Sequence, residues 1–347
     1  RQLVQGGDTV GRLGGDEFWI LLTELASPAQ CEHALQSLLH EIARPLQLGE
    51  LQLQLTASIG ATLFPYDDCD ADTLLRHADQ AMYQAKQQGR HRYQLFDSQQ
   101  ARQQRNHSEQ QARIAQALAG GELCLYYQPK VDMQDGRIVG AEALLRWQHP
   151  ALGVLLPGAF LPLIEDSPLI ASVGQWVIDT ALAQLAVWQR EGLPLTVSVN
   201  VAASQLQQPD FAAQLAHSLA RYPALSPQYL ELEILESAAL HDMGQVSEVM
   251  QACQALGVSF ALDDFGTGYS SLTCCKRLPA SLLKIDQSFV RDMLDNGEDR
   301  ALVEGVISLA RAFGRDVIAE GVETIAHAHA LRSLGCHLGQ GYGIARP

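Results

Sequence analysis

The sequence predicts two α/β units, the larger of which is a (β/α)8 barrel of the TIM type in the C-terminal two-thirds of the chain. Two observations predict this architecture. Beyond about residue 113, strand-like segments alternate with segments of helical periodicity, and eight candidate strands end near a polar or charged residue. The 347 residues suffice for two domains. We expect a smaller α/β domain at 1–97, a linker helix at 98–112 and the barrel at 113–347.

The first part of the chain mixes strand and helix signals. The apolar run Phe18–Leu22 predicts a buried strand, and the alternation of Leu with Gln over Leu51–Leu55 predicts a half-exposed one. Residues 71–88 have helical periodicity, which Gly89 ends. The next segment, 97–105, is polar, rich in Gln and free of Gly and Pro, so we expect an exposed helix that links the two domains.

Segment 195–201 indicates what lines the predicted barrel, because its residues alternate between an apolar and a polar face. The apolar face holds Leu195, Val197, Val199 and Val201, and the polar face holds Thr196, Ser198 and Asn200. Parallel strands are normally covered on both sides, so an enclosed polar face predicts a lined cavity. The same alternation recurs at 230–234, 260–263 and 283–286, and segment 173–188 has the apolar spacing of a covering helix.

Composition excludes some classes of function. The formal net charge of −15 and the isoelectric point near 5.1 argue against a binder of nucleic-acid polymers, although bound metal ions can still attract a small anionic substrate. Seven Cys residues without a CxxC pair favour a reducing, cytoplasmic setting. No apolar run approaches the roughly 18–20 residues of a membrane span. Because the chain begins at Arg1 without Met, we expect a piece of a longer protein, attached to a membrane only through upstream segments.

The predicted strand ends, where barrel enzymes carry their chemistry, are unusually acidic. They hold Gln128, Glu142, Asn200, Glu233, Asp263 with Asp264, Lys284, Glu320 and Gln340. Carboxylates gathered at one rim repel one another unless a cation is bound or several are protonated. Because these strand ends offer oxygen donors and neither Cys nor His, we expect Mg²⁺ or Mn²⁺ rather than zinc.

The adjacent Asp263 and Asp264 suit two metal ions, because one carboxylate can bridge them while the other binds the second ion. Two ions roughly 3.5–4 Å apart hold the attacking and leaving oxygens of a phosphoryl displacement. Lys284 would add positive charge near the oxyanion or orient the attacking water. The pattern predicts metal-assisted phosphoester hydrolysis without naming a substrate. Singly, these residues have ordinary alternatives: a turn for Asn200, helix-start acids for Glu142 and Glu320, and surface positions for Lys284 and Arg146.

Short motifs follow one another in a fixed order across residues 110–347. They are Tyr127-Gln128-Pro129, Glu142-Ala143-Leu144 within Glu142–Trp147, Asn200, Glu233-Ile234-Leu235-Glu236, the loop Asp263–Leu272, Lys284-Ile285-Asp286, Glu320-Gly321-Val322-Glu323-Thr324 and Gln340-Gly341-Tyr342. With these motifs the chain resembles the EAL family of cyclic di-GMP phosphodiesterases. It departs at Leu235, where Thr is usual, and at Gln287, where a basic residue is common. The resemblance implies metal-dependent hydrolysis of cyclic di-GMP to linear pGpG in bacterial second-messenger signalling, usually by a homodimer formed through this domain.

The resemblance also implies a role for individual residues. The first metal ion would be bound by Glu142, Asn200, Glu233 and Asp263, and the second by Asp263 and Asp264. The catalytic residues would be Glu320, Lys284 and Asp264, and the substrate contacts Gln128, Arg146 and Gln340. Glu236 would anchor the loop Asp264–Leu272, and Glu323 would support the site. We expect Mg²⁺ or Mn²⁺ as two ions, and inhibition by Ca²⁺.

Residues before the linker carry a second set of motifs. They are Arg12–Phe18 around Gly14, Gly15, Asp16 and Glu17, then Ser58-Ile59-Gly60, and Ala78–Lys86 running to Arg90. They resemble the C-terminal portion of a GGDEF domain, the diguanylate cyclase family. The glycines would let the backbone approach a nucleotide, and Glu17 would help to bind metal. The family's first metal-binding Asp would lie upstream of Arg1, so we expect a partial domain without cyclase activity.

Three functional readings follow. The first is an active cyclic di-GMP phosphodiesterase, since every metal ligand of the motif is present. The second is a catalytically silent receptor that binds cyclic di-GMP and signals by changing shape. The third is a bifunctional cyclase and phosphodiesterase in the full-length protein.

Overall fold

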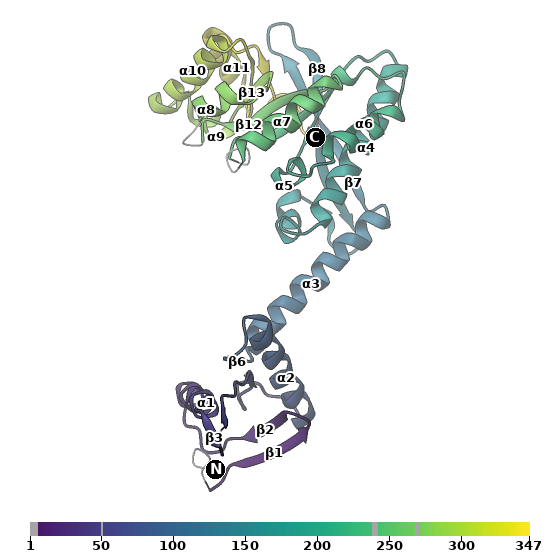
Figure 1. Cartoon of the computed structure of the whole chain (residues 1–347). Coiled ribbons are helices and arrows are strands. Elements are labelled where there is room, and N and C mark those ends of the chain that lie inside the picture. The colour runs from purple at the N-terminus through teal and green to yellow at the C-terminus, as the bar shows by residue number, and fades with distance from the viewer. Residues whose placement is uncertain (1–5, 50, 238–241, 268–270) are drawn as a thin grey trace. The chain divides into compact units, whose positions relative to one another are not determined.

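The computed structural model describes residues 6–49, 51–237, 242–267 and 271–347, with the side chain of Ser271 left aside. The chain divides into two compact units, Arg1–Glu109 and Gln110–Pro347. Helix α3, Ser98–Ala119, contributes residues to both and is labelled in Figure 1. It begins one residue after the predicted end of the first domain. The predicted boundaries themselves stay a prediction.

The first unit contains short strands and two long helices. Its elements are β1 Thr9–Gly14, β2 Glu17–Leu21, α1 Pro28–Ile42, β3 Leu46–Leu48, β4 Leu51–Leu53, β5 Ile59–Ala61, α2 Ala71–Gln87 and β6 Tyr93–Leu95. Strands β1 and β2 pair antiparallel, β3 and β4 pair antiparallel, and β5 and β6 pair parallel. The predicted helix at 71–88 is confirmed: Asp70 caps its first turn, and Gly89, with a φ of 112°, follows its end.

The predicted burial of the Phe18–Leu22 strand is wrong. Strand β2 forms there, but Phe18 is 62% and Leu21 55% exposed. Within the part of the chain that the structure describes, β2 pairs with β1 alone, and side chains on this two-stranded sheet stay accessible. The predicted strand at Leu51–Leu55 is the three-residue β4, whose side chains are exposed rather than half-buried.

The second unit is a closed eight-stranded barrel with helices on its outside, which confirms the predicted fold class. Its strands are β7 Leu123–Asp132, β8 Arg137–His149, β10 Thr196–Asn200, β11 Leu230–Leu235, β12 Ser259–Phe265, β13 Leu282–Ile285, β14 Asp316–Ala319 and β15 Leu338–Gly339. A further short strand, β9 Gly153–Leu155, pairs antiparallel with the end of β8. The ring closes because β8 pairs with β10 as well as with β7, and β15 pairs with β7.

The helices of this unit follow the strands in alternation. They are α4 Leu169–Arg190, α5 Ala203–Leu206, α6 Phe211–Ala220, α7 Met243–Ala255, α8 Ser271–Arg277, α9 Gln287–Asp292, α10 Gly297–Ala312 and α11 Ile325–Leu334, with short 3-10 turns at Pro157–Ala159, Leu161–Leu163 and Pro227–Tyr229. Helix α4 packs on β7 and β10, α7 on β12, and α10 on β13 and β14 (Figure 1). The apolar faces of strands and helices meet in one large core that includes Val197, Leu232 and Phe260.

We had expected a wholly parallel barrel, and this expectation is wrong. Strand β7 runs antiparallel to β8 and to β15, because a tight turn through Gly136, with a φ of 75°, joins β7 directly to β8. Gln128 and Glu142 therefore lie opposite each other within these two strands, and the prediction that they end strands is wrong. The remaining strands, from β8 and β10 to β15, pair parallel.

Helix α4 corrects a second expectation. It has 22 residues, and an 18-residue window within it has a mean hydropathy of 1.3, so it is long and apolar enough to cross a membrane by length and composition alone. Its apolar character has another explanation in this fold, because Val177, Ile178, Ala181 and Leu182 are buried against the barrel wall. A helix that covers a sheet needs a broad apolar face, which a hydropathy window cannot distinguish from a membrane span.

The barrel interior is built in layers. Ala261, Leu282 and Ile318 form a small buried apolar cluster. Two residues further along the same strands, and therefore on the same face, stand Asp263, Lys284 and Glu320. The polar residues thus lie at the carboxyl ends of these strands, above an apolar floor. The polar face that the alternation of segment 195–201 predicted contributes to this interior, where Ser198 is fully buried and bonds Glu231.

Candidate active site

Lys284 stands at the centre of the polar layer. Its side chain is 1% exposed, so the reading of Lys284 as a surface residue is wrong. Its Nζ lies 2.6 Å from Oε2 of Glu233, 2.7 Å from Oε1 of Glu320, 3.0 Å from Oδ1 of Asp263 and 3.8 Å from Oε2 of Glu142. Four carboxylates, from β8, β11, β12 and the residue that follows β14, therefore converge on one ammonium group.

Glu142 is held by amides on both of its oxygens. Asn200 donates its Nδ2–H to Oε1 of Glu142 at 2.7 Å, and Gln340 donates its Nε2–H to Oε2 at 2.6 Å. The same Gln340 amide group donates to Oε1 of Gln128 at 2.9 Å, and Gln128 in turn donates to the carbonyl of Ala345 at 2.9 Å. Glu142 lies inside strand β8 and Glu320 follows β14 well before α11 begins, so neither is a helix-start acid.

The pair Asp263–Asp264 adopts a special backbone conformation at the end of β12. Asp264 has a φ of 51°, and its N–H donates to Oδ1 of Asp263 at 3.0 Å. The register between β12 and β13 shifts at this point, which turns the two adjacent side chains away from simple alternation. As a result, Asp263, Asp264 and Glu320 each offer one oxygen atom within 4.8 Å of the others, a spacing that could hold a metal ion.

Glu236 connects this pair to the loop that follows. It is 1% exposed, its Oε2 accepts the N–H of Gly266 at 3.0 Å, and its own N–H donates to the carbonyl of Asp263 at 3.1 Å. This arrangement fits the predicted anchoring of the loop Asp264–Leu272. Residues 268–270 of that loop lie outside the described residues, so the anchoring stays a prediction.

The remaining predicted residues make other contacts or are exposed. Arg146 is 9% exposed on β8, where it bonds the carbonyl of Leu145 and lies over the ring of Tyr126 at 5.6 Å. Glu323 is exposed after β14. Gly14 and Gly15 form the exposed turn between β1 and β2 in the first unit, beside Asp16 and Glu17. The roles of these residues stay predictions.

The electrostatics of the site are those of a cluster with too few cations. Burial raises the pKa of Glu320 to about 8, an effect that Asp263 and Glu142 reinforce. Burial together with Asp263 and Asp286 raises the pKa of Asp264 to about 7. Although burial opposes it, the ammonium groups of Lys130 and Lys284 lower the pKa of Glu233 to about 2. The cluster can therefore exchange protons for a bound cation at neutral pH.

Divalent metal binding should therefore be linked to proton release. Below about pH 7–8 the carboxyls of Asp264 and Glu320 hold protons that a metal ion must displace, so affinity for Mn²⁺ should fall as the pH is lowered from about 8.5 to about 6. Calorimetric titration in buffers of different ionisation enthalpy measures the protons released. Equal affinity at both ends of this range, without proton release, would contradict the linkage.

Sequence reasoning missed three buried residues beneath the cluster. Lys130 Nζ donates to Oε1 of Glu231 at 3.1 Å and to Oε1 of Glu233 at 2.7 Å, and it also contacts the Ser198 hydroxyl. Ser198 donates to Oε1 of Glu231 at 2.6 Å. Lys130 stands two residues after Gln128 on the same face of β7, and Ser198 and Glu231 occupy the polar faces of alternating strands. Once Gln128 is placed inside a strand, the alternation of side chains along that strand predicts that Lys130 lies on the same face.

Lys130→Met should destabilise the metal-free protein by about 3–5 kcal/mol, because Glu231 and Glu233 lose a cation where water cannot replace it. The double variant Lys130→Met with Glu231→Gln should recover part of this loss, since it removes one of the two stranded charges. Urea unfolding of both variants measures the difference. A double variant that is less stable than Lys130→Met would show that an unpaired charge on Glu231 does not cause the loss of stability.

Comparison with known proteins settles the family. Residues 111–347, more than half of the chain, match the family described as EAL domain. The chain belongs to the EAL-domain family. Residues 1–92 match the family described as diguanylate cyclase, GGDEF domain. A GGDEF region therefore precedes the EAL domain, and both resemblances predicted from the motifs are confirmed.

Curated relatives share this order. The bifunctional diguanylate cyclase/cyclic di-GMP phosphodiesterase MucR of Pseudomonas aeruginosa is 40% identical over 348 residues, which cover 100% of this chain and 50% of MucR. The cyclic di-GMP phosphodiesterase PA2567 of the same organism is 42% identical over 235 residues, which cover 67% of this chain and 40% of that protein. The chain thus spans about half the length of the curated relatives it matches.

Solved EAL structures resemble the second unit. The PaMucR phosphodiesterase in complex with c-di-GMP is 40% identical, with a TM-score of 0.66 over 69% of this chain and 97% of that one. The EAL domain of Mycobacterium smegmatis DcpA is 34% identical, with a TM-score of 0.55 over 66% of this chain and 92% of that one. The barrel described above is therefore an EAL fold.

Proposed function

We propose that this EAL domain hydrolyses cyclic di-GMP to linear pGpG and uses two divalent ions, Mg²⁺ or Mn²⁺. One observation carries the proposal. Glu142, Glu233, Asp263 and Glu320 converge on the single ammonium group of Lys284, and Asp264 stands beside them. The relatives named phosphodiesterases and the relative solved with c-di-GMP support the choice of substrate.

The donor set fits such ions. Oxygen atoms of Asp263, Asp264 and Glu320 approach within 4.8 Å of one another. Burial, reinforced by neighbouring carboxylates, raises the pKa of Asp264 and of Glu320, so a bound cation would stabilise their charged forms. Hard oxygen donors suit Mg²⁺ and Mn²⁺. We infer that Glu142, Asn200, Glu233 and Asp263 hold one ion and that Asp263 and Asp264 hold the second. When bound, the ions supply Lewis acidity toward the phosphate and the attacking water.

The chain's own residues would position and protonate the reactants. Hydrolysis breaks one phosphoester bond, transfers the water oxygen to phosphorus, and requires one proton to leave the water and one to reach the departing sugar oxygen. Glu320, whose pKa is raised to about 8, is matched to proton transfer at neutral pH, and Lys284 beside it places an ammonium group near the developing negative charge. Gln128, Gln340 and Arg146 would contact the substrate.

The decisive experiment is incubation of the purified chain with cyclic di-GMP and Mg²⁺ or Mn²⁺, with products separated by chromatography. We expect pGpG, suppressed by EDTA and by Ca²⁺. Binding of intact cyclic di-GMP without product, in either metal, would favour the receptor function instead. Neither binding nor product would refute the assignment of substrate.

Other properties of the whole protein are part of the same proposal. We expect a cytoplasmic domain and a homodimer formed through the EAL domain, which sedimentation of the purified chain tests. The GGDEF region would act as a regulator or as a cyclase in the full-length protein. An assay for cyclic di-GMP synthesis from GTP, on the full-length protein and on this chain, separates these roles.

A further inference from the structure

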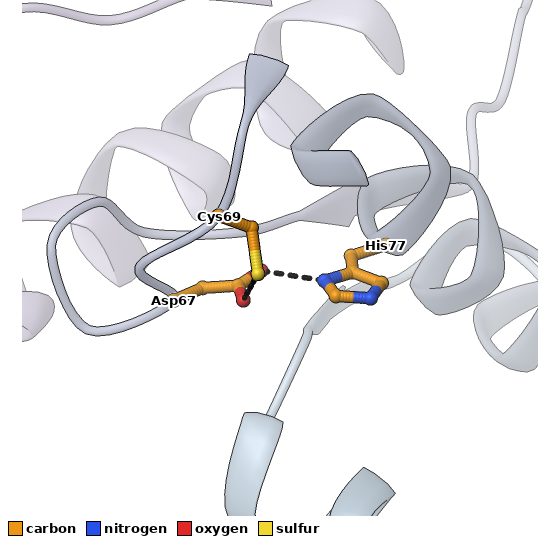
Figure 2. Close-up of side chains that lie close together, drawn as sticks. All are labelled: Asp67, Cys69 and His77. Atoms are coloured by element: carbon orange, nitrogen blue, oxygen red, sulfur yellow. Dashed lines mark hydrogen bonds and ion pairs between the residues drawn. The ribbon is translucent and has the colours of Figure 1, made fainter. Parts of the chain in front are cut away.

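A second group of side chains that could hold a metal ion lies in the first unit. Asp67 and Cys69 stand in the segment between β5 and α2, and His77 lies in α2. Nδ1 of His77 is 2.8 Å from Oδ2 of Asp67, and Sγ of Cys69 is 3.4 Å from Oδ1 (Figure 2). One ligand atom from each residue lies within 4.8 Å of the other two.

Separate contacts hold each of the three side chains. Asp67 is 4% exposed, its N–H donates to the carbonyl of Leu63 at 2.7 Å, and its Oδ2 accepts the hydroxyl of Thr62 at 2.6 Å. The ring of His77 stacks on Phe96 at 4.0 Å between centroids, with an interplanar angle of 12°. The group is therefore held in place before any ligand arrives, and Thr62 supplies the outer hydrogen bond that orients a ligating carboxylate.

Cys69 lies next to the start of α2 and is exposed to solvent. It directly precedes Asp70, whose carboxylate caps α2 by accepting the N–H of Thr73 at 2.9 Å. Its own N–H donates to the carbonyl of Asp67 at 3.1 Å, which brings its sulfur back over the Asp67 carboxylate (Figure 2). Of the seven cysteines, Cys69 is the exposed one, whereas five are buried and Cys124 is intermediate. A metal ion can therefore reach this thiol from solvent.

We propose that Asp67, Cys69 and His77 bind a zinc-type transition-metal ion, distinct in class from the ions of the barrel. Sulfur, imidazole and carboxylate together form the donor set of Zn²⁺, whereas Mg²⁺ avoids sulfur. Zinc bonds of about 2.0–2.3 Å at tetrahedral angles place ligand atoms about 3.3–3.8 Å apart. The sulfur of Cys69 lies 3.4 Å from Oδ1 of Asp67, which meets this spacing, whereas Nδ1 of His77 lies 2.8 Å from the other oxygen, Oδ2. A single Asp67 oxygen would therefore reach this spacing from both partners only after the side chains rotate.

The three proposed ligands line a cavity that could admit a further ligand of a bound ion. Asp67, Cys69 and His77 line a cavity of about 220 Å³ together with Arg76, Arg102 and Arg105. Three protein ligands with one accessible position are the arrangement of a zinc site that exchanges its fourth ligand. The three guanidinium groups favour an anion or hydroxide there over neutral water, because they raise the local positive potential.

Co²⁺ added to the metal-stripped whole chain tests the proposal, since Co²⁺ replaces zinc and reports its ligands by absorption. A thiolate ligand gives a near-ultraviolet charge-transfer band, which the oxygen and amide ligands of the barrel cannot produce. We expect this band in the unaltered chain, its loss in Cys69→Ser and in His77→Gln, and its disappearance when Zn²⁺ displaces Co²⁺. Cys124→Ser, which changes the partly accessible thiol elsewhere, should keep the band.

Far-ultraviolet circular dichroism checks that each variant is folded, and exposed Cys69 makes its serine variant the least disruptive. The proposal is overturned if the folded, unaltered chain gives no band, because Asp67 then serves only as the hydrogen-bond acceptor for Thr62, Cys69 and His77. It is also overturned if the band survives Cys69→Ser, because the thiolate then comes from another cysteine.

Discussion

Glu142→Ala should lower turnover of cyclic di-GMP by roughly 1,000-fold or more, an effect of the size seen when a group that stabilises the transition state is lost. Glu142 is 6% exposed, and both of its carboxylate oxygens are engaged, by Asn200 and by Gln340. Alanine would remove a proposed metal ligand and leave both amides without their acceptor. Turnover in Mg²⁺ and in Mn²⁺, followed by chromatography of pGpG, measures the loss.

The matched control is Glu304→Ala, which removes an exposed glutamate from α10 and should leave turnover unchanged. Binding of intact cyclic di-GMP in Ca²⁺ should survive Glu142→Ala, because Gln128 and Arg146 remain to contact the substrate. Near-full turnover of Glu142→Ala in Mg²⁺ would mean that Glu142 does not hold an ion, and the proposed ligand set would have to be redrawn.

Lys284→Met should have two separable effects. Turnover should fall by about 100- to 1,000-fold, since the ammonium group beside Glu320 is lost. The metal-free protein should also lose about 3–5 kcal/mol of unfolding free energy, because Glu233, Asp263 and Glu320 would share a buried region without their common cation. Methionine has a similar length, so the apolar part of the side chain would still fill its space.

Metal ions should restore much of that stability without restoring turnover. Urea unfolding of Lys284→Met with EDTA and with Mn²⁺ measures the recovery, which mass action relates to the affinity of the ion. Lys276→Met, which changes an exposed lysine on α8, is the control and should alter neither quantity. If Mn²⁺ left the stability of Lys284→Met unchanged, the carboxylates would not be the groups that bind the metal.

The sequence predicted the residue content of the EAL site better than its geometry. Asn200, Glu233, Asp263 and Lys284 could be grouped because parallel strands bring their carboxyl ends together, and this holds for β10 to β13. Gln128 and Glu142 belong to the group for another reason. They lie opposite each other in the antiparallel pair of β7 and β8, and the side chain of Gln340 contacts both. Motif order grouped these two residues with the others although the assumed strand direction was wrong.

Other features were invisible because they depend on tertiary contacts. The burial of Lys284 and the network of Lys130 with Glu231 require strands that are distant in sequence, and lysine is normally a surface residue. The exposure of Phe18 in β2 depends on what covers that strand, which an apolar run cannot report. The left-handed backbone conformation of Asp264 could not be predicted, because Asp adopts this conformation less often than Gly and no glycine marks the position.

The way the barrel closes also bears on how the protein is made. The first strand of the barrel, β7, pairs with its last strand, β15, and Gln340 donates a hydrogen bond to Gln128, 212 positions away in the sequence. Contacts between such distant segments form late and slow folding, because a long loop must be ordered first. The polar cluster is therefore complete only once β15 has paired, because Gln340, which follows β15, donates to Glu142. The proposed catalysis would then depend on closure of the barrel.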